Sequence, residues 1–124
     1  MRAVKLWVDN VRDKDQNPQC IYDLAFHPEG KLLIVTAGSR VLVYDSSDGR
    51  VQQTLKGHRD LVYCLSYTRD GSRFASGGAD KTVIIWDAES GEGVLKYTHN
   101  DSIQCLAYSP VSQLLLSCTS SDIG

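Results

Sequence analysis

The apolar residues of this chain fall in short runs separated by polar turn residues, and no long stretch keeps the 3.6-residue period of a helix. The runs are rich in β-branched and aromatic residues, which favours strands. Two sets of four strands are predicted: Cys20–Phe26, Lys31–Thr36, Arg40–Tyr44 and Val51–Leu55, then Leu61–Tyr67, Arg73–Ser76, Thr82–Trp86 and Gly93–Tyr97. The pattern therefore predicts an all-β fold.

Turn residues separate the predicted strands at matching places in the two sets. Pro28-Glu29-Gly30 and Asp48-Gly49 interrupt the first set, and Asp70-Gly71 and Ser90-Gly91 interrupt the second. Glycine tolerates the positive φ that tight turns require, and an aspartate side chain bonds back to nearby backbone. We therefore expect hairpin turns at these four places.

The sequence also repeats itself. Residues 21–26 read IYDLAF, residues 62–67 read VYCLSY and residues 103–108 read IQCLAY, which is a spacing of 41. VLVYD at 41–45 matches VIIWD at 83–87 with a spacing of 42. Four strands in each unit of about 40 residues is the pattern of one β-propeller blade.

The second unit begins with Gly57-His58 and ends with Trp86-Asp87, and it resembles a WD40 repeat with its signature intact. The resemblance implies a partial WD40 β-propeller over residues 1–124. We expect an N-terminal strand at Ala3–Val8 and a polar insert within residues 1–19, a first blade over 20–55, a second over 56–97, and half of a third over 98–124. Such a chain leaves apolar faces and a strand edge uncovered, so we expect it to be marginally stable alone.

His58, Ser76 and Asp80 are the residue types of a hydrolase triad, but no Gly-x-Ser-x-Gly turn surrounds Ser76. The WD40 resemblance instead implies a structural tetrad in which Trp86, Ser76, His58 and Asp80 form a buried hydrogen-bond chain. Each group supplies the donor or acceptor that the next one needs. A partial third tetrad is expected from His99, Ser117 and Asp122. No catalytic residue, cofactor or metal is predicted.

Other candidate residues have plainer explanations. Gly77-Gly78 lacks the Gly-Lys-Ser/Thr ending of a phosphate loop and is expected to form a tight turn. His27 is expected to be a solvated surface histidine. The charged residues in or near loops are expected to form a solvated rim or to contact a partner; they are Lys56, Arg59, Arg69, Asp70 and Arg73.

Four cysteines are present, and none of them forms a Cys-x-x-Cys pair. Cys64 and Cys105 hold equivalent repeat positions and are expected to be small apolar fillers, with a disulfide or metal role left open. Without a secretion signal in the sequence, reduced thiols are the default.

Composition excludes other classes of protein. The chain is 42% apolar and 23% charged, with a net charge of -2 and both signs interspersed, so it lacks the basic stripe of a nucleic-acid module. No apolar run approaches the length of about 20 residues that a membrane span needs. The N-terminal apolar stretch is too short for a signal peptide.

Longer stretches resemble one group of WD-repeat proteins, the WD-repeat subunits of intraflagellar transport complex A. The stretches are LVYDSSDG, LKGHRDLVYC, RFASGGADKTVIIW and LKYTHNDSIQC, and MRAV and THND are not general WD40 features. This resemblance implies a non-enzymatic scaffold in retrograde ciliary transport, cilium assembly and cargo entry. The implied partners are other complex A subunits and ciliary membrane-protein cargo, and the implied location is cytoplasm, cilium and basal body. A generic WD40 adaptor and, remotely, a hydrolase remain alternatives.

Overall fold

The computed structural model describes residues 9–13, 15–109 and 115–119, and in these ranges every regular element is a β-strand. The all-β prediction is confirmed. No helix able to cross a membrane is found among these residues. The expected strand at Ala3–Val8 and the tetrad candidate Asp122 lie outside the described ranges. The strands are β1 (Leu24–Phe26), β2 (Leu32–Ala37), β3 (Arg40–Asp45), β4 (Val51–Lys56), β5 (Val62–Tyr67), β6 (Arg73–Gly78), β7 (Thr82–Asp87), β8 (Gly93–Thr98), β9 (Ile103–Tyr108) and β10 (Leu115–Thr119).

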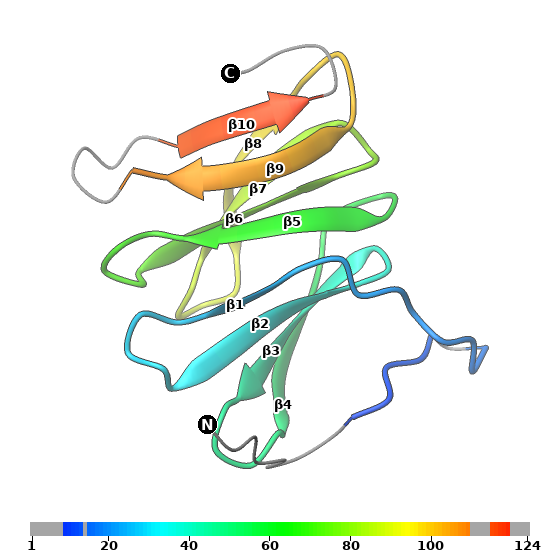
Figure 1. Ribbon diagram of the computed structural model, residues 1–124, viewed down its shortest axis with the longest axis vertical. Coiled ribbons are helices and arrows are strands. Elements are labelled where there is room, and N and C mark those ends of the chain that lie inside the picture. Colours follow the sequence, from blue (N-terminus) through cyan, green and yellow to red (C-terminus); the bar gives the residue numbers. More distant parts are fainter. Residues whose placement is uncertain (1–8, 14, 110–114, 120–124) are drawn as a thin grey trace, which may run out of the picture.

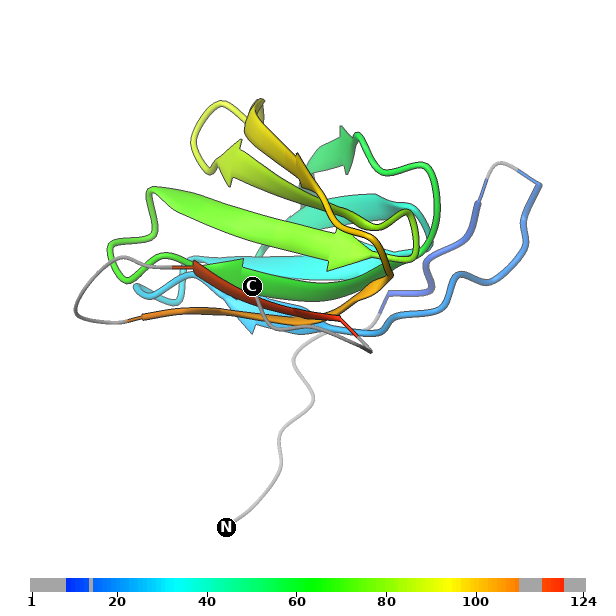
Figure 2. The same cartoon turned by 90° about the horizontal axis from the view of Figure 1, so that it is seen from above.

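The strands form three antiparallel sheets, and in each sheet consecutive strands are neighbours. The first blade has the order β1-β2-β3-β4 and the second has β5-β6-β7-β8, while β9 pairs with β10 in the third. The first strands of the three blades lie next to one another, and the outer strands splay away from them (Figures 1 and 2). This arrangement is a partial propeller, as predicted.

The first predicted strand is shorter than expected, because β1 covers only Leu24–Phe26 of the predicted Cys20–Phe26. A side chain takes over the pairing there. The Thr36 hydroxyl oxygen accepts hydrogen bonds from the backbone N–H groups of Tyr22 at 2.9 Å and Asp23 at 3.1 Å. The backbone of this segment is thus satisfied without a ladder.

The prediction of a turn at Gly77-Gly78 is wrong, because both residues lie inside β6. The two glycines are needed for close packing. A Cβ atom at Gly77 would lie 2.6 Å from Cγ2 of Ile103 in the third blade, and one at Gly78 would collide with the carbonyl oxygen of Leu61. Glycine at these positions allows close approach of backbone and side chain rather than a turn.

The largest apolar cluster lies between the first and second blades. Ile34 and Val41 come from the first blade, and Phe74 and Trp86 come from the second. A smaller cluster joins the second blade to Ile103 of the third. The core is therefore built from blade against blade, which is how neighbouring repeats stabilise each other.

Part of the polar insert packs on the other face of the first blade. Val11 packs against the apolar cluster on that face, which includes Tyr44. The Tyr44 hydroxyl donates to Oδ2 of Asp9 at 2.8 Å, and an N–H of Arg40 donates to the Arg12 carbonyl at 3.1 Å. Burial, together with the hydrogen bond to Asp9, raises the pKa of Tyr44 to about 12.

Candidate functional site

Four residues of the second blade form one continuous hydrogen-bond chain. Trp86 on β7 donates its indole N–H to the hydroxyl oxygen of Ser76 on β6 at 2.8 Å. That oxygen lies 2.6 Å from Nε2 of His58, in the loop before β5. Nδ1 of His58 lies 3.0 Å from Oδ2 of Asp80, in the turn after β6. The structure thus brings all four candidate tetrad residues together.

Each donor of this chain has an acceptor within the chain when His58 is neutral with its proton on Nδ1. Ser76 then accepts from the indole and donates to Nε2, while the Nδ1 proton is donated to Asp80. Burial lowers the pKa of His58 against the opposing influence of the Asp80 carboxylate. Asp80 also accepts the backbone N–H groups of Arg59 at 3.1 Å and Thr82 at 3.2 Å, which holds its turn in place.

The same residues are poorly placed for hydrolysis. The Ser76 side chain is fully buried, with 0% exposure, and its hydroxyl is shared between Trp86 and His58. A nucleophile must reach a bound substrate, and this oxygen faces only protein. The hydrolase alternative built on Ser76, His58 and Asp80 therefore fails on access.

The other two blades hold only parts of this network. In the third blade the Ser117 hydroxyl lies 3.1 Å from Nε2 of His99, which repeats one link. In the first blade Tyr44 replaces the tryptophan and bonds to Asp9 instead, and Ser39 lies exposed where the second blade has Asp80. Only the second blade has four linked side chains among the described residues.

The histidine at position 27 is not simply solvated, so that expectation is wrong. Its ring is half-buried and meets the ring of Tyr67 edge-on, with 5.3 Å between centroids. A Cβ atom at Gly71 would collide with it. Tyr67 in turn contacts Phe74, which stacks on Trp86 with 6.3 Å between centroids. An aromatic row thus runs from the first blade to the tetrad.

Two side chains that sequence reasoning missed join neighbouring blades. Oδ2 of Asp23 accepts the backbone N–H of Leu65 at 2.9 Å, and Oγ of Ser66 accepts that of Tyr108 at 3.2 Å. Both bonds span 42 residues, about one repeat. The available signal was a polar side chain in, or just before, the first strand of these two blades.

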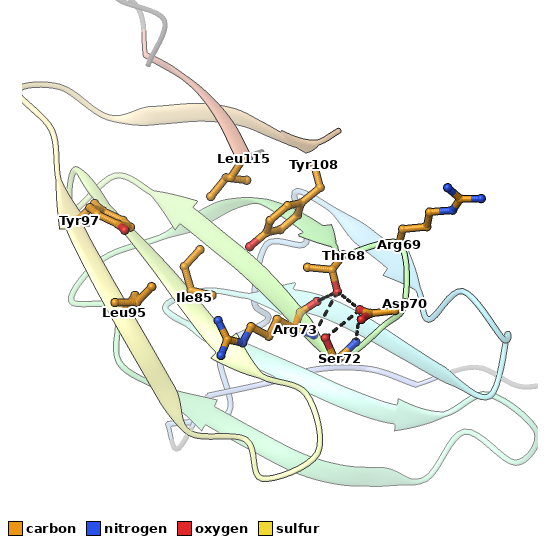
Figure 3. A pocket seen from close by; sticks show the side chains of 10 residues that line it. All are labelled: Thr68, Arg69, Asp70, Ser72, Arg73, Ile85, Leu95, Tyr97, Tyr108 and Leu115. Atoms are coloured by element: carbon orange, nitrogen blue, oxygen red, sulfur yellow. Dashed lines mark hydrogen bonds between the residues drawn. The ribbon is translucent and has the colours of Figure 1, made fainter. Parts of the chain in front are cut away.

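A pocket of about 750 Å³ lies between the outer strands of the second blade and the β9–β10 hairpin (Figure 3). One end is polar, because Asp70 accepts hydrogen bonds from Thr68 and Ser72 within the β5–β6 turn. Arg69 and Arg73 also line the pocket, and the remaining walls are apolar side chains, some of them substantially exposed, such as Tyr97 at 52%. The apolar lining residues are Ile85, Leu95, Tyr97, Tyr108 and Leu115.

Comparisons with known proteins agree with this geometry. Residues 20–124 match the model of the family described as the IFT122 first beta-propeller. The chain belongs to that family. It is 64% identical over all 124 residues to the Intraflagellar transport protein 122 homolog of Xenopus tropicalis and 62% identical to that of Danio rerio. The chain spans about a tenth of the length of these relatives, 10% in each case.

The solved structures give the same fold. The crystal structure of RRP9 WD40 repeats matches with a TM-score of 0.77 and 25% identity, over 80% of this chain and 32% of that one. The WD40 β-propeller prediction is therefore confirmed. Propellers of the IFT122 and WD40 families are generally non-enzymatic, and the described residues contain no cluster of three or more acidic, histidine or cysteine side chains that could hold a metal.

The loop charges predicted to form a rim on this IFT122-type propeller are all exposed; they are Lys56, Arg59, Arg69, Asp70 and Arg73. Hydrogen bonds from the backbone and side chain of Ser72 and from the side chain of Thr68 also lower the pKa of Asp70 to about 2.

The two cysteines at equivalent repeat positions differ in exposure. Cys64 is buried as a filler on β5, and burial raises its pKa to about 12. Cys105 holds the equivalent position on β9 but is exposed, so the filler prediction is wrong there.

Proposed function

We propose that this chain is a non-enzymatic protein-interaction scaffold, the WD40 part of an intraflagellar transport complex A subunit. Its work is retrograde ciliary transport, cilium assembly and cargo entry, in the cytoplasm, the cilium and the basal body. Its partners are other complex A subunits and ciliary membrane-protein cargo. The observation that carries the proposal is identity of 62–64% over all 124 residues to two Intraflagellar transport protein 122 homologs.

The tetrad has a structural role in this proposal. His58, Ser76, Asp80 and Trp86 hold the second blade, and His99 and Ser117, with Asp122, do the same in the third. Burial of Ser76 and Trp86 supports this role, because a satisfied buried network rigidifies a core but offers nothing to a partner. Partner contacts then belong to the exposed turns around the blades, as is usual for loops on a rigid scaffold.

A chimera tests the transport role. The chimera is the Danio rerio relative with this chain in place of its own corresponding segment. It is expressed in ciliated cells that lack the relative. We expect complex A subunits to co-purify with the chimera and transport particles to stop accumulating at the ciliary tip. A stably expressed chimera that recovers neither property would contradict the proposal and favour a WD40 adaptor of another pathway.

The position of the contacts is tested on the same chimera. Lys56→Glu with Arg59→Glu reverses two exposed charges beside the tetrad loop. We expect weaker co-purification without a change in protein level. Lys31→Glu with Arg50→Glu reverses two exposed charges in the turns at the other end of the first blade and is the matched control. Equal co-purification for both variants would exclude this stretch of the rim.

A further inference from the structure

A groove of about 350 Å³ lies between the end of β4 in the first blade and strands β7 and β8 in the second. Its most buried lining residues, Ile84 and Trp86, form a floor that belongs to the core between these two blades. Lys56 of the first blade and Lys96 of the second also line it. Both blades have all four of their strands, so the groove is formed without any residue of the third blade.

Two glycines leave the floor of the groove uncovered. A Cβ atom at Gly57 would lie 2.9 Å from Cη2 of Trp86, and one at Gly93 would lie 3.4 Å from Cγ2 of Ile84. A larger residue at either position would stand against the floor. The missing side chains therefore leave room for an apolar side chain from another molecule.

The groove carries positive charge that the described residues do not neutralise. No acidic residue lines it, and neither Lys56 nor Lys96 forms an ion pair with a described residue. Lys31 and Arg50, in the turns of the first blade, instead pair with neighbouring carboxylates at N–O distances of 3.1 Å and 3.6 Å. Two unpaired ammonium groups beside an apolar floor are complementary to an occupant that has both carboxylates and an apolar side chain.

The number of charges favours a protein segment over other anionic partners. Anionic lipid surfaces are recognised by clusters of about 4–8 basic residues, and nucleic acids by a basic face or stripe. This groove has two lysines, and the chain has a net charge of -2. A small groove with a tryptophan in its floor instead fits one short segment of chain, because an apolar anchor in a pocket supplies most of the binding energy of such contacts.

We propose that the groove between Lys56 and Lys96 binds a short acidic segment of a partner protein. An apolar side chain of that segment packs on Ile84 and Trp86, and carboxylates before and after it pair with the two lysines. The charges select the partner and speed its approach, while the apolar contact holds it. This inference rests on the proposed scaffold function, because it assigns a place and a charge to one of the protein contacts.

The test uses the purified chimera with the Danio rerio relative. A fluorescein-labelled peptide, with a Leu-Phe pair flanked on each side by two glutamates, is titrated with the chimera, and fluorescence anisotropy gives the dissociation constant. The control peptide has glutamine in place of each glutamate. We expect the acidic peptide to bind at least about tenfold more tightly, and to lose most of this advantage in about 0.5 M salt because exposed charge pairs are screened.

Charge reversal shows whether the contact is in the groove. Lys56→Glu with Lys96→Glu should weaken binding of the acidic peptide at least about tenfold. Lys31→Glu with Arg50→Glu makes the same change of charge at exposed turns outside the groove, and should change binding less than about twofold. Lysines that only protect the outer strands from pairing would give no such contrast, because a glutamate also discourages pairing.

Cross-linking locates the contact even if a variant fails to fold. A carbodiimide joins a lysine to a carboxylate that it touches, so we expect links from Lys56 or Lys96 of the unmodified chimera to the glutamates of the peptide, mapped by mass spectrometry. Links confined to other lysines, equal binding of the two peptides, or equal effects of the two double variants would each overturn the proposal. Tighter binding to phosphatidylserine vesicles through the same lysines would also overturn it, in favour of a membrane contact.

The groove and the scaffold role fail in different ways. A chimera that co-purifies with complex A subunits but does not bind the acidic peptide refutes the groove and leaves the scaffold role standing. A chimera that binds the peptide through Lys56 and Lys96 but recovers neither co-purification nor transport supports the groove and refutes the transport role.

Discussion

The first and second blades share one strand order, but they satisfy the buried polar side chain on their third strand differently. Both are four-stranded, and the register shifts at the same place, between Val43 and Tyr44 in one and between Ile85 and Trp86 in the other. The second blade buries a chain of side chains that ends at Asp80 in a turn. The first blade instead uses Tyr44, which reaches a residue of the insert. A four-stranded blade therefore forms without the tetrad. We expect the tetrad to contribute instead to the free energy of unfolding.

The largest effect is expected from Trp86→Ala. Trp86 is 4% exposed and lies in the cluster between the two blades, so its truncation leaves a cavity in the shared core. We expect a loss of about 3–5 kcal/mol in the free energy of unfolding, measured by urea denaturation and circular dichroism. Leu95→Ala, at a 48% exposed position of β8, should change little. A loss no greater than that of the control would show that the tetrad blade does not depend on its tryptophan.

A smaller loss is expected from Asp80→Ala. It leaves the buried Nδ1–H of His58 without an acceptor and removes two backbone contacts. The expected cost is about 1–3 kcal/mol, measured in the same way. Ser39→Ala changes the equivalent turn of the first blade, where the side chain is exposed, and should stay within about 0.5 kcal/mol. Equal effects of the two substitutions would remove the difference drawn between the blades.

Tyr44→Phe should cost about 1 kcal/mol or less, because it removes one hydrogen bond to an exposed carboxylate and keeps the ring. Asp9→Ala removes the same bond from the other side. If the bond is the only change, the double variant should lose no more than either single variant, which a double-mutant cycle of unfolding free energies measures. Fully additive losses would mean that the insert does not stabilise the first blade through Tyr44.

The smallest effect is a dependence of stability on pH that arises from His58 in the second blade. The folded pKa of His58 lies below its ordinary value of 6.5, so the unfolded chain takes up a proton first as the pH falls. The stability linked to His58 is present above about pH 6.5 and is lost as the pH falls through the folded pKa. His58→Gln does not titrate and should flatten the slope of stability against pH below about pH 6.5. Parallel slopes for the two chains would contradict this.

The sequence was sufficient to predict the strands and the hydrogen-bonded residues that lie within a single blade. Alternation and turns predicted the strands, and the resemblance to WD40 repeats implied the tetrad of His58, Ser76, Asp80 and Trp86, which the structure places in one chain. The roles of Asp23 and Gly77 could not be predicted, because each contacts a residue of the next blade and the contact depends on how the blades pack. Thr36 was missed since one hydroxyl there replaces a stretch of backbone pairing, which no periodicity records.

The close approach of Ile103 to Gly77 limits how these repeats could be rearranged. The Ile103 methyl group occupies the space that a side chain at Gly77 would need. The second and third blades can therefore pack this closely only because residue 77 has no side chain. The third blade has Cys118 at the equivalent position, one repeat further on. The repeats are therefore not interchangeable modules. A designer who builds a longer array by copying the second blade keeps this joint, whereas copying the third brings a thiol into it and forces the following blade to stand further away.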